Sequence, residues 1–135
     1  MQQLRLIVLL FVSALLIASC GRNNPMVNVV DAPLMAPQSA AMDAITETIL
    51  GSGVRRGWKM TMLEPGLIRG KIVVNNKHTV EVDITYNETD FSINYVNSIN
   101  MNYTVRDGVA NIHPKYNRWV RILKEDIQDQ MQQLQ

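Results

Sequence analysis

The chain has few of the residues from which catalytic and metal sites are usually built. Its 135 residues include one cysteine and two histidines, His78 and His113. A single cysteine excludes a disulfide within the chain, and a metal site needs several His, Cys or carboxylate ligands at workable spacing. The sequence also lacks a Gly-rich phosphate loop, a His-Glu-x-x-His motif and a Gly-x-Ser-x-Gly motif. We therefore expect a protein that is not an enzyme and that uses no cofactor and no metal.

An excess of charge of one sign is missing as well. The chain has 13 Lys and Arg against 12 Asp and Glu, and Arg5 is the one charged residue among the first 19. Removing those 19 residues leaves 12 charges of each sign. Nucleic-acid-binding proteins normally show a basic excess, because neutralising phosphates supplies much of their affinity. Nucleic acid is therefore not expected among the partners.

The first residues are arranged like a secretory signal. Arg5 precedes an apolar stretch from Leu6 to Ile17, which is too short to span a bilayer, and small residues follow it. Ile17-Ala18-Ser19-Cys20 resembles the bacterial lipobox, which implies cleavage before Cys20 and diacylglycerol on its sulfur. The alternative for Cys20, a small buried apolar residue, does not account for its position straight after Ala18-Ser19. We predict a lipoprotein signal peptide at 1–19 and lipidation of Cys20.

A lipidated Cys20 would anchor the mature protein to a membrane, because stable anchoring takes more than one acyl chain and mature bacterial lipoproteins usually have three. Gly21 stands where an Asp would resemble the inner-membrane retention signal of enteric bacteria. We therefore expect the protein in the bacterial cell envelope, attached to the outer membrane and facing the periplasm.

Residues 20–38 are predicted to form a flexible tether. They include three prolines and show no sustained periodicity. Proline and small polar residues cannot bury enough surface to offset the entropy lost on ordering. The alternative is a short strand from Met26 to Val30 that adds to the edge of a sheet. The remaining residues, 39–135, suffice for one domain.

Amphipathic helices are predicted at both ends of this domain. Ser39 can cap a helix whose apolar face includes Met42, Ile45 and Ile49, and Gly51-Ser52-Gly53 would stop it. Pro114 suits the first position of a second, longer helix. The apolar stripe of that helix comprises Tyr116, Trp119, Val120, Leu123, Ile127, Met131 and Leu134.

Between the two helices the hydrophobic pattern has a period of two, which indicates strands. The strands are expected to begin at Trp58, to run from Ile68 to Val74 and to run from His78 to Tyr86, with turns at Pro65-Gly66 and 75–77. Matching their apolar faces sets two basic residues of one strand against two acidic residues of the next, on the solvent side of the sheet. The four residues are Arg69, Lys71, Glu81 and Asp83.

A further strand is expected after the loop 87–90. That loop length pairs Tyr86 with Phe91, Ile84 with Ile93 and Val82 with Tyr95. The asparagine-rich stretch 97–103 is interpreted as an irregular extension of the sheet, and Asp107-Gly108 as a turn. We predict a two-layer α+β domain with a helix, a three- or four-stranded antiparallel meander and a long C-terminal helix. Both helices should cover the sheet face that bears Ile72, Val80, Val82, Ile84 and Ile93.

Five short motifs are distributed along the domain: Arg56-Gly57-Trp58, the Pro65-Gly66 turn, Val82-Asp83-Ile84-Thr85-Tyr86, the stretch Ser98 to Tyr103, and Ile112-His113-Pro114-Lys115-Tyr116-Asn117-Arg118-Trp119-Val120. They resemble motifs of a family of small proteobacterial outer-membrane lipoproteins without an assigned function. Together they cover most of the domain. The resemblance implies a localisation and a fold, but no catalytic residue.

The candidate binding residues lie at two junctions between elements. Arg55, Arg56 and Trp58 lie between the first helix and the first strand, and His113, Tyr116, Asn117 and Trp119 lie at the start of the last helix. If the junctions meet, they would form a cationic, aromatic-lined groove for an acidic group or an extended peptide. The alternative is that the aromatic residues are core anchors and the arginines are solvated.

Two functions stay open at this stage. The first is a non-enzymatic binding or assembly-accessory module, anchored to the membrane by its lipid and capturing an envelope protein by strand addition at a sheet edge. The second is a carrier or sensor of a small ligand, such as a lipid or cell-wall fragment, held between sheet and helices. An exposed strand edge would favour the first function. A cavity between the layers would favour the second.

Overall fold

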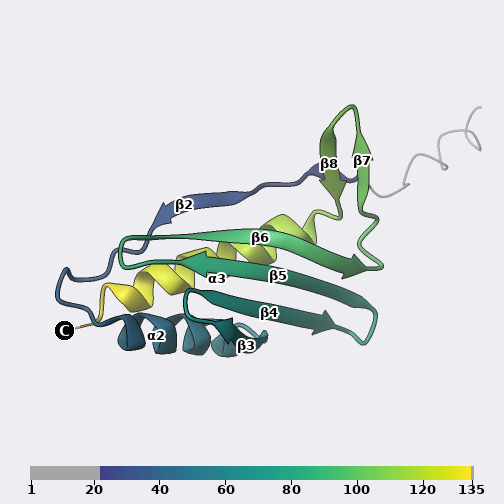
Figure 1. Ribbon diagram of the computed structural model, residues 1–135. Helices are drawn as coiled ribbons and strands as arrows, with labels where there is room; N and C mark the ends of the chain where they lie inside the picture. The colour runs from purple at the N-terminus through teal and green to yellow at the C-terminus, as the bar shows by residue number, and fades with distance from the viewer. Residues whose placement is uncertain (1–21, 135) are drawn as a thin grey trace, which may run out of the picture.

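The structure of the protein is a computed structural model that describes residues 22–134 (Figure 1). The predicted signal peptide and the predicted lipidation site, Cys20, lie outside the described residues. The described part of the chain forms the helices α2 (Met42–Arg55) and α3 (Lys115–Met131). Its strands are β1 (Asn24–Pro25), β2 (Val29–Pro33), β3 (Lys59–Glu64), β4 (Leu67–Val74), β5 (His78–Tyr86), β6 (Asp90–Ile99), β7 (Thr104–Arg106) and β8 (Val109–Ile112).

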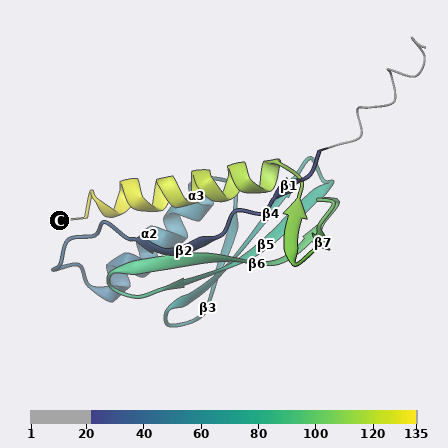
Figure 2. The ribbon, with the colours of Figure 1, turned by 90° about the horizontal axis from the view of Figure 1, so that it is seen from above.

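The predicted α+β architecture is confirmed. Five strands form an antiparallel sheet in the order β2-β6-β5-β4-β3, and three form a small second sheet in the order β1-β8-β7. Figures 1 and 2 show α2 and α3 together on one face of the larger sheet. The buried side chains of both layers join in one core. It includes the five predicted sheet residues and, from α3, Tyr116, Val120, Leu123, Ile127 and Met131.

The predicted pairing of the central strands is confirmed residue by residue. Across the loop 87–90, Tyr86 pairs with Phe91, Ile84 with Ile93 and Val82 with Tyr95. The tight turns come where the sequence predicts them, and Gly66 of the β3–β4 turn has a φ of 82°, which favours glycine. The meander therefore has four strands, with β3 at its outer edge.

The charged residues on the solvent face of the meander pair as predicted. Arg69 lies opposite Asp83, with its Nε 2.8 Å from Oδ1, and Lys71 lies opposite Glu81, with Nζ 3.2 Å from Oε1. The carboxylate of Asp83 raises the pKa of Arg69, first through the hydrogen bond and then through its charge. Each of the four charged residues thus has an oppositely charged partner on the neighbouring strand.

The prediction of a flexible tether at 20–38 is wrong for most of its described part. β1 pairs with β8, and β2 pairs with β6 at the edge of the large sheet. Leu34 is fully buried, and its N–H donates to the carbonyl of Thr89 at 2.9 Å. The apolar residues Val29, Ala32 and Leu34 bury surface that offsets the cost of ordering. Within the described residues the first strand therefore begins at Asn24, and the alternative of an added edge strand is closer to the structure.

The predicted ends of the first helix are also wrong. Ala41 rather than Ser39 is the N-cap residue, and α2 runs through Gly51-Ser52-Gly53 to Arg55. Arg56 is the C-cap residue, and Gly57 after it has a φ of 84°. There the N–H of Trp58 donates to the carbonyl of Gly53 at 2.9 Å and the N–H of Gly57 to that of Val54 at 3.1 Å. This is the Schellman arrangement, which satisfies the last carbonyls of a helix.

The small second sheet was not predicted, although its turn was. Asp107 and Gly108 both have positive φ and connect β7 to β8, as the Asp-Gly signal predicts. The asparagine-rich stretch is irregular, as expected, because Asn100 and Asn102 adopt left-handed backbone conformations after β6. Met101 between them is buried, and its carbonyl accepts a hydrogen bond from the N–H of His113 at 2.8 Å. The irregular stretch thereby joins the two sheets to the start of α3.

Candidate functional site

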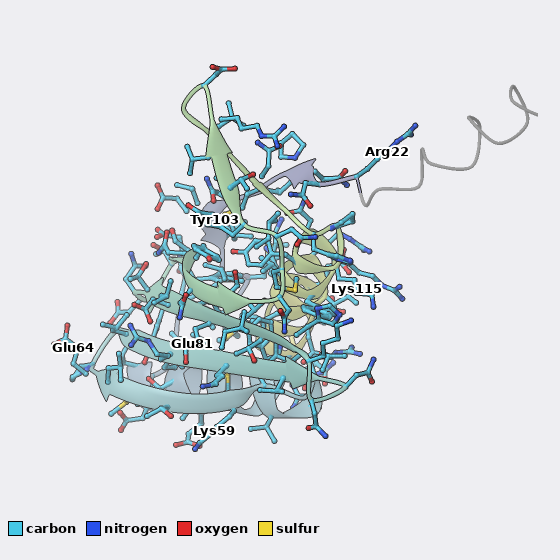
Figure 3. The ribbon with its side chains drawn as sticks, turned by 90° about the vertical axis from the view of Figure 1, so that its right-hand side faces the viewer. Arg22, Lys59, Glu64, Glu81, Tyr103 and Lys115 are labelled. Carbon is cyan, nitrogen blue, oxygen red and sulfur yellow. The ribbon has the colours of Figure 1, made fainter. Side chains whose placement is uncertain are left out.

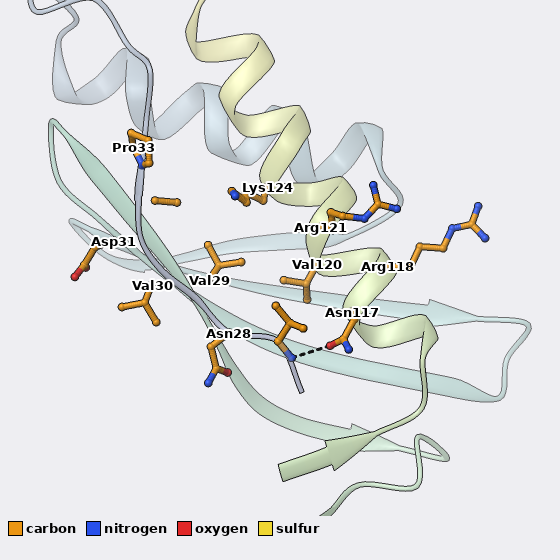
Figure 4. Close-up of a pocket in the computed structure, with 12 residues that line it drawn as sticks. Asn28, Val29, Val30, Asp31, Pro33, Asn117, Arg118, Val120, Arg121 and Lys124 are labelled. Carbon is orange, nitrogen blue, oxygen red and sulfur yellow. Dashed lines mark hydrogen bonds between the residues drawn. The ribbon is translucent and has the colours of Figure 1, made fainter. Parts of the chain in front are cut away.

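A pocket of about 690 Å³ lies between β2 and the first half of α3 (Figure 4). The segment 27–33 forms one wall, and α3 forms the other with Asn117, Arg118, Val120, Arg121 and Lys124. Val29 and Val120 belong to the buried core and give the pocket an apolar base. The volume is in the range of small-molecule sites, which are typically about 300–1,000 Å³.

The pocket exists because α3 holds this part of the chain at two places. At the start of the segment, the N–H of Val27 donates to Oδ1 of Asn117 at 2.9 Å, and Nδ2 of Asn117 donates to the carbonyl of Pro25 at 2.9 Å. At the end of the strand, Nε2 of Gln128 donates to the carbonyl of Pro33 at 2.8 Å. Between these two clamps, β2 and α3 are separated by the space of the pocket.

The middle of β2 is bent. Its pairing with β6 shifts between Val29 and Ala32, and Asp31 has a φ of 47°. The N–H of Asp31 donates to Oγ of Ser92 at 2.9 Å, which fixes the bend. Val30 is 66% exposed. β2 is therefore an edge strand with an unpaired outer side and an apolar residue in contact with solvent.

The helix wall of the pocket is basic. Figure 4 shows Lys124 pointing toward the strand, whereas the guanidinium groups of Arg118 and Arg121 point outward, and Asp31 points away from the helix. Arg121 forms an ion pair with Glu125 at 3.2 Å. Among the described residues no carboxylate lies within ion-pair distance of Lys124 or Arg118. The pocket thus combines an apolar base with the ammonium group of Lys124, which points toward the strand and can bind an acidic group.

The structure does not bring the two predicted junctions into one groove. Arg55 and Arg56 both bind Asp126, with nitrogen–oxygen distances of 2.9 and 2.8 Å. Asp126 lies about 13 Å further along α3 than Asn117, at 1.5 Å per residue. Burial raises the pKa of Asp126, but the hydrogen bonds and charges of the two arginines outweigh it, and the pKa lies below its usual value. The two arginines thus neutralise a buried carboxylate at the contact between α2 and α3.

Most of the predicted aromatic residues belong to the core. Trp58 and Tyr116 are 3% and 1% exposed, and Trp119 is partly buried against the core. Burial raises the pKa of Tyr116. Tyr95 lies between Tyr103, on which it stacks at 4.5 Å, and Tyr116, which it meets edge-on at 5.8 Å. These residues fit the alternative of core anchors that the sequence left open.

His113 forms a pair with His78 at the start of α3. Their ring centroids are 5.7 Å apart. Nδ1 of His113 lies 3.2 Å from the N–H of Lys115 and accepts from it, whereas Nδ1 of His78 lies 2.8 Å from the carbonyl of Asn100 and must donate. Burial lowers the pKa of His113, and the charges of His78 and Lys115 lower it further. The pair thus connects β5 with the start of the last helix.

Of the seven predicted binding residues, Asn117 alone lines the pocket between β2 and α3. The strand residues were missed because the segment was interpreted as a tether. A usable signal was the set of basic residues Arg118, Arg121 and Lys124, spaced three apart on the last helix beside its apolar stripe. A second signal was the alternative strand at 26–30.

Residues 22–134 contain neither a metal-binding cluster nor a membrane-spanning helix. No three His, Cys, Asp or Glu side chains of this part of the chain are grouped so that they could hold a metal ion. Neither described helix is long and apolar enough to cross a membrane. Comparison of the chain with protein-family models, with curated proteins and with solved structures gave no match.

Proposed function

We propose that the chain is a non-enzymatic binding module of the bacterial cell envelope, anchored by acyl chains on Cys20 to the outer membrane and facing the periplasm. Its site is the pocket between β2 and α3, which captures an extended, acidic segment of an envelope protein. The observation that supports this function is the free outer edge of β2 beside the basic wall of α3.

An extended peptide can use both features of the site. Backbone groups on the outer side of an edge strand can bind an added strand, and side-chain pockets then give specificity. Val27, just before β2, and Val30, within it, are 58% and 66% exposed and offer apolar contact to the peptide. Lys124 can bind a carboxylate of the peptide at the pocket. The bend at Asp31 and the proline at position 33 limit the added strand to a short length.

In-cell crosslinking tests this proposal. A photo-reactive residue in place of Arg118 lies at the pocket, and the same residue in place of exposed Lys59 lies on β3, at the opposite edge of the sheet. We expect reproducible capture of one envelope protein from position 118 and not from position 59. Lys124→Glu should abolish that capture, and Lys124→Arg should retain it. Equal capture from both positions, or capture of lipid and abundant bystanders alone, would contradict the proposal.

The anchoring is tested separately. Metabolic labelling with an alkyne fatty acid should label the wild-type protein, and Cys20→Ser should lose both the label and the cleavage of the signal peptide. Gly21→Asp should move the protein from the outer to the inner membrane. A wild-type protein that is neither labelled nor found in membranes would refute the lipoprotein assignment.

The volume of the pocket supports a second function, the carriage or sensing of a small amphipathic ligand with an acidic group. Native mass spectrometry of the purified protein would show a lipid or cell-wall fragment of defined mass bound to the chain. The ligand should be lost in Lys124→Glu and retained in Lys59→Glu. A bound ligand together with failed protein capture would favour this function over the first.

A further inference from the structure

The described domain has no excess charge, but its charges are separated along its length. Residues 22–134 include 12 basic and 12 acidic residues. One end of the domain is formed by the β4–β5 turn, the β7–β8 hairpin and the start of α3 (Figure 1). The opposite end is formed by the start of α2, the β3–β4 turn and the β5–β6 loop. We call them the hairpin end and the loop end.

The hairpin end is basic. Arg22, Lys77, Arg106 and Lys115 are exposed there, and among the described residues no carboxylate lies within ion-pair distance of any of them. Contacts tie their segments together: Nδ2 of Asn100 donates to the carbonyl of Lys77, and Nδ2 of Asn23 donates to the carbonyl of Asn102. Figure 3 shows this end, with Arg22 and Lys115 extending outward. Asp107 is the acidic residue of the hairpin turn.

The loop end is acidic. Asp43 and Glu47 lie beside the Pro65-Gly66 turn, and Glu88 lies close to the same turn across the β5–β6 loop. Glu64 precedes that turn, and Asp90 ends the loop. The segments 37–47, 64–67 and 86–90 contain no Lys or Arg. Because β6 is 10 residues long, the two ends are about 30 Å apart.

The chain leaves the described domain at its basic end. Asn24 is the first residue of β1, which pairs with β8 of the hairpin sheet. Cys20 precedes Asn24 by four residues, which span at most about 14 Å. At physiological ionic strength the Debye length is about 8 Å, and interactions between exposed charges that are further apart are largely screened. An anchor on Cys20 would therefore keep the hairpin end, and not the loop end, within the reach of charges on a membrane surface.

We propose that the hairpin end is a membrane-docking face whose Arg22, Lys77, Arg106 and Lys115 contact anionic phospholipid headgroups of the leaflet that holds the acyl chains. This inference rests on the proposed lipidation of Cys20. The same headgroups would repel the acidic loop end if the domain tipped toward the bilayer, so this end points away from the membrane. β6 and α3, which run between the two ends, then stand steeply on the bilayer. The pocket along their side stays open to the periplasm.

Two labelled variants of the lipidated protein test the orientation. Asp107→Cys and Glu88→Cys each remove one carboxylate from an exposed turn, one at each end, and each thiol takes a fluorophore while Cys20 is acylated. The proteins are reconstituted in vesicles of phosphatidylglycerol and phosphatidylethanolamine that contain a headgroup nitroxide quencher. We expect strong quenching at position 107 and little at position 88. The difference should shrink in phosphatidylcholine vesicles and at high salt, because it depends on charge.

Charge variants distinguish an effect of the basic face from an effect of the net charge of the protein. Arg22→Gln, Arg106→Gln and Lys115→Gln together should abolish the difference in quenching between the two labels. Asp43→Asn, Glu47→Gln and Glu64→Gln together change the net charge by the same amount with the opposite sign, and should leave the difference in place. If both sets of substitutions changed the difference in quenching equally, the result would overturn the docking face.

Flotation of the vesicles distinguishes the two proposals. Protein that does not float with the vesicles is not anchored, and this result would overturn both the lipid anchor and the docking face. Protein that floats but shows equal quenching at both positions, or stronger quenching at position 88, would overturn the docking face alone.

Discussion

Asn117 on α3 holds Val27, which lies 90 positions earlier in the sequence, by accepting a hydrogen bond from its N–H at 2.9 Å. The same side chain donates to the carbonyl of Pro25. One amide group thus satisfies backbone groups on both sides of Met26, between β1 and β2. This contact fixes one end of the pocket.

Asn117→Ala should free the N-terminal strands. The variant loses two hydrogen bonds, and we expect the free energy of unfolding to fall by about 1–3 kcal/mol. Hydrogen exchange at Val27 and Val29 should accelerate more than exchange in β5, because the clamp acts locally. Asn94→Ala on the exposed side of β6 should change stability by less than about 0.5 kcal/mol. Unchanged exchange in β2 would show that the clamp is dispensable.

Two glycines of α2 should respond in opposite directions to alanine. A Cβ added at Gly51 would have Nη1 of Arg55 as its nearest neighbour, at an ordinary contact distance of 3.5 Å. Gly51→Ala should therefore stabilise the helix by about 0.5–1 kcal/mol. A Cβ at Gly53 would overlap the side chain of Met60, so Gly53→Ala should destabilise the protein by about 1–3 kcal/mol. Thermal and urea unfolding measure both. Changes of the same sign would contradict the helical environment assigned to this segment.

The pairing of the meander could be predicted because each contact is set by a short turn. The loop 87–90 brings Ile84 opposite Ile93, and the alternation of apolar residues then fixes the register as far as Val82 and Tyr95, beyond which a bulge shifts the pairing. The first helix shows the limit of such local signals. Gly51 and Gly53 predict a helix stop, but Gly53 lies inside the helix in close contact with Met60, and the left-handed Gly57 follows the end of the helix.

The pocket could not be predicted in the same way. It depends on contacts between segments far apart in the chain: Val29 pairs with Ile93, and Gln128 holds Pro33. Neither contact follows from periodicity, because β2 is bent and its pairing shifts. The predicted groove failed for a related reason. The arginines at the end of α2 bind Asp126, whose burial on α3 depends on how the two helices cross.

Asp126→Asn should weaken the contact between the two helices. The carboxylate is buried, but its arginine partners are about half exposed, so solvent screening limits the expected loss of stability to about 1–2 kcal/mol at neutral pH. Because the folded protein lowers the pKa of Asp126, this contribution is present above its usual value of 3.8 and is lost as pH falls through the lower folded pKa.

Urea unfolding of both proteins as a function of pH measures this effect. The stability difference between wild type and Asp126→Asn should narrow in acid. Asp129→Asn, at an exposed position three residues further on, should track the wild type throughout. A constant difference between wild type and Asp126→Asn down to the most acidic conditions would show that the charge of the carboxylate is not what stabilises the contact.

His113 should make the start of α3 sensitive to mild acid. The folded protein lowers the pKa of His113, so below 6.5 the unfolded chain binds a proton that the folded chain does not. The contribution of neutral His113 is complete above 6.5 and is lost as pH falls toward the lower folded pKa. Protonation also removes the acceptor at Nδ1 from the N–H of Lys115. Stability should therefore fall as pH drops below 6.5.

His113→Asn tests this assignment. Asparagine keeps an acceptor for the N–H of Lys115 but has no proton to gain, so the fall in stability across this pH range should be reduced. His78→Asn removes the neighbour whose charge lowers the pKa of His113, so the ring of His113 should then titrate at higher pH in NMR spectra. A His113→Asn protein with the same pH dependence as the wild type would place the sensitive group elsewhere.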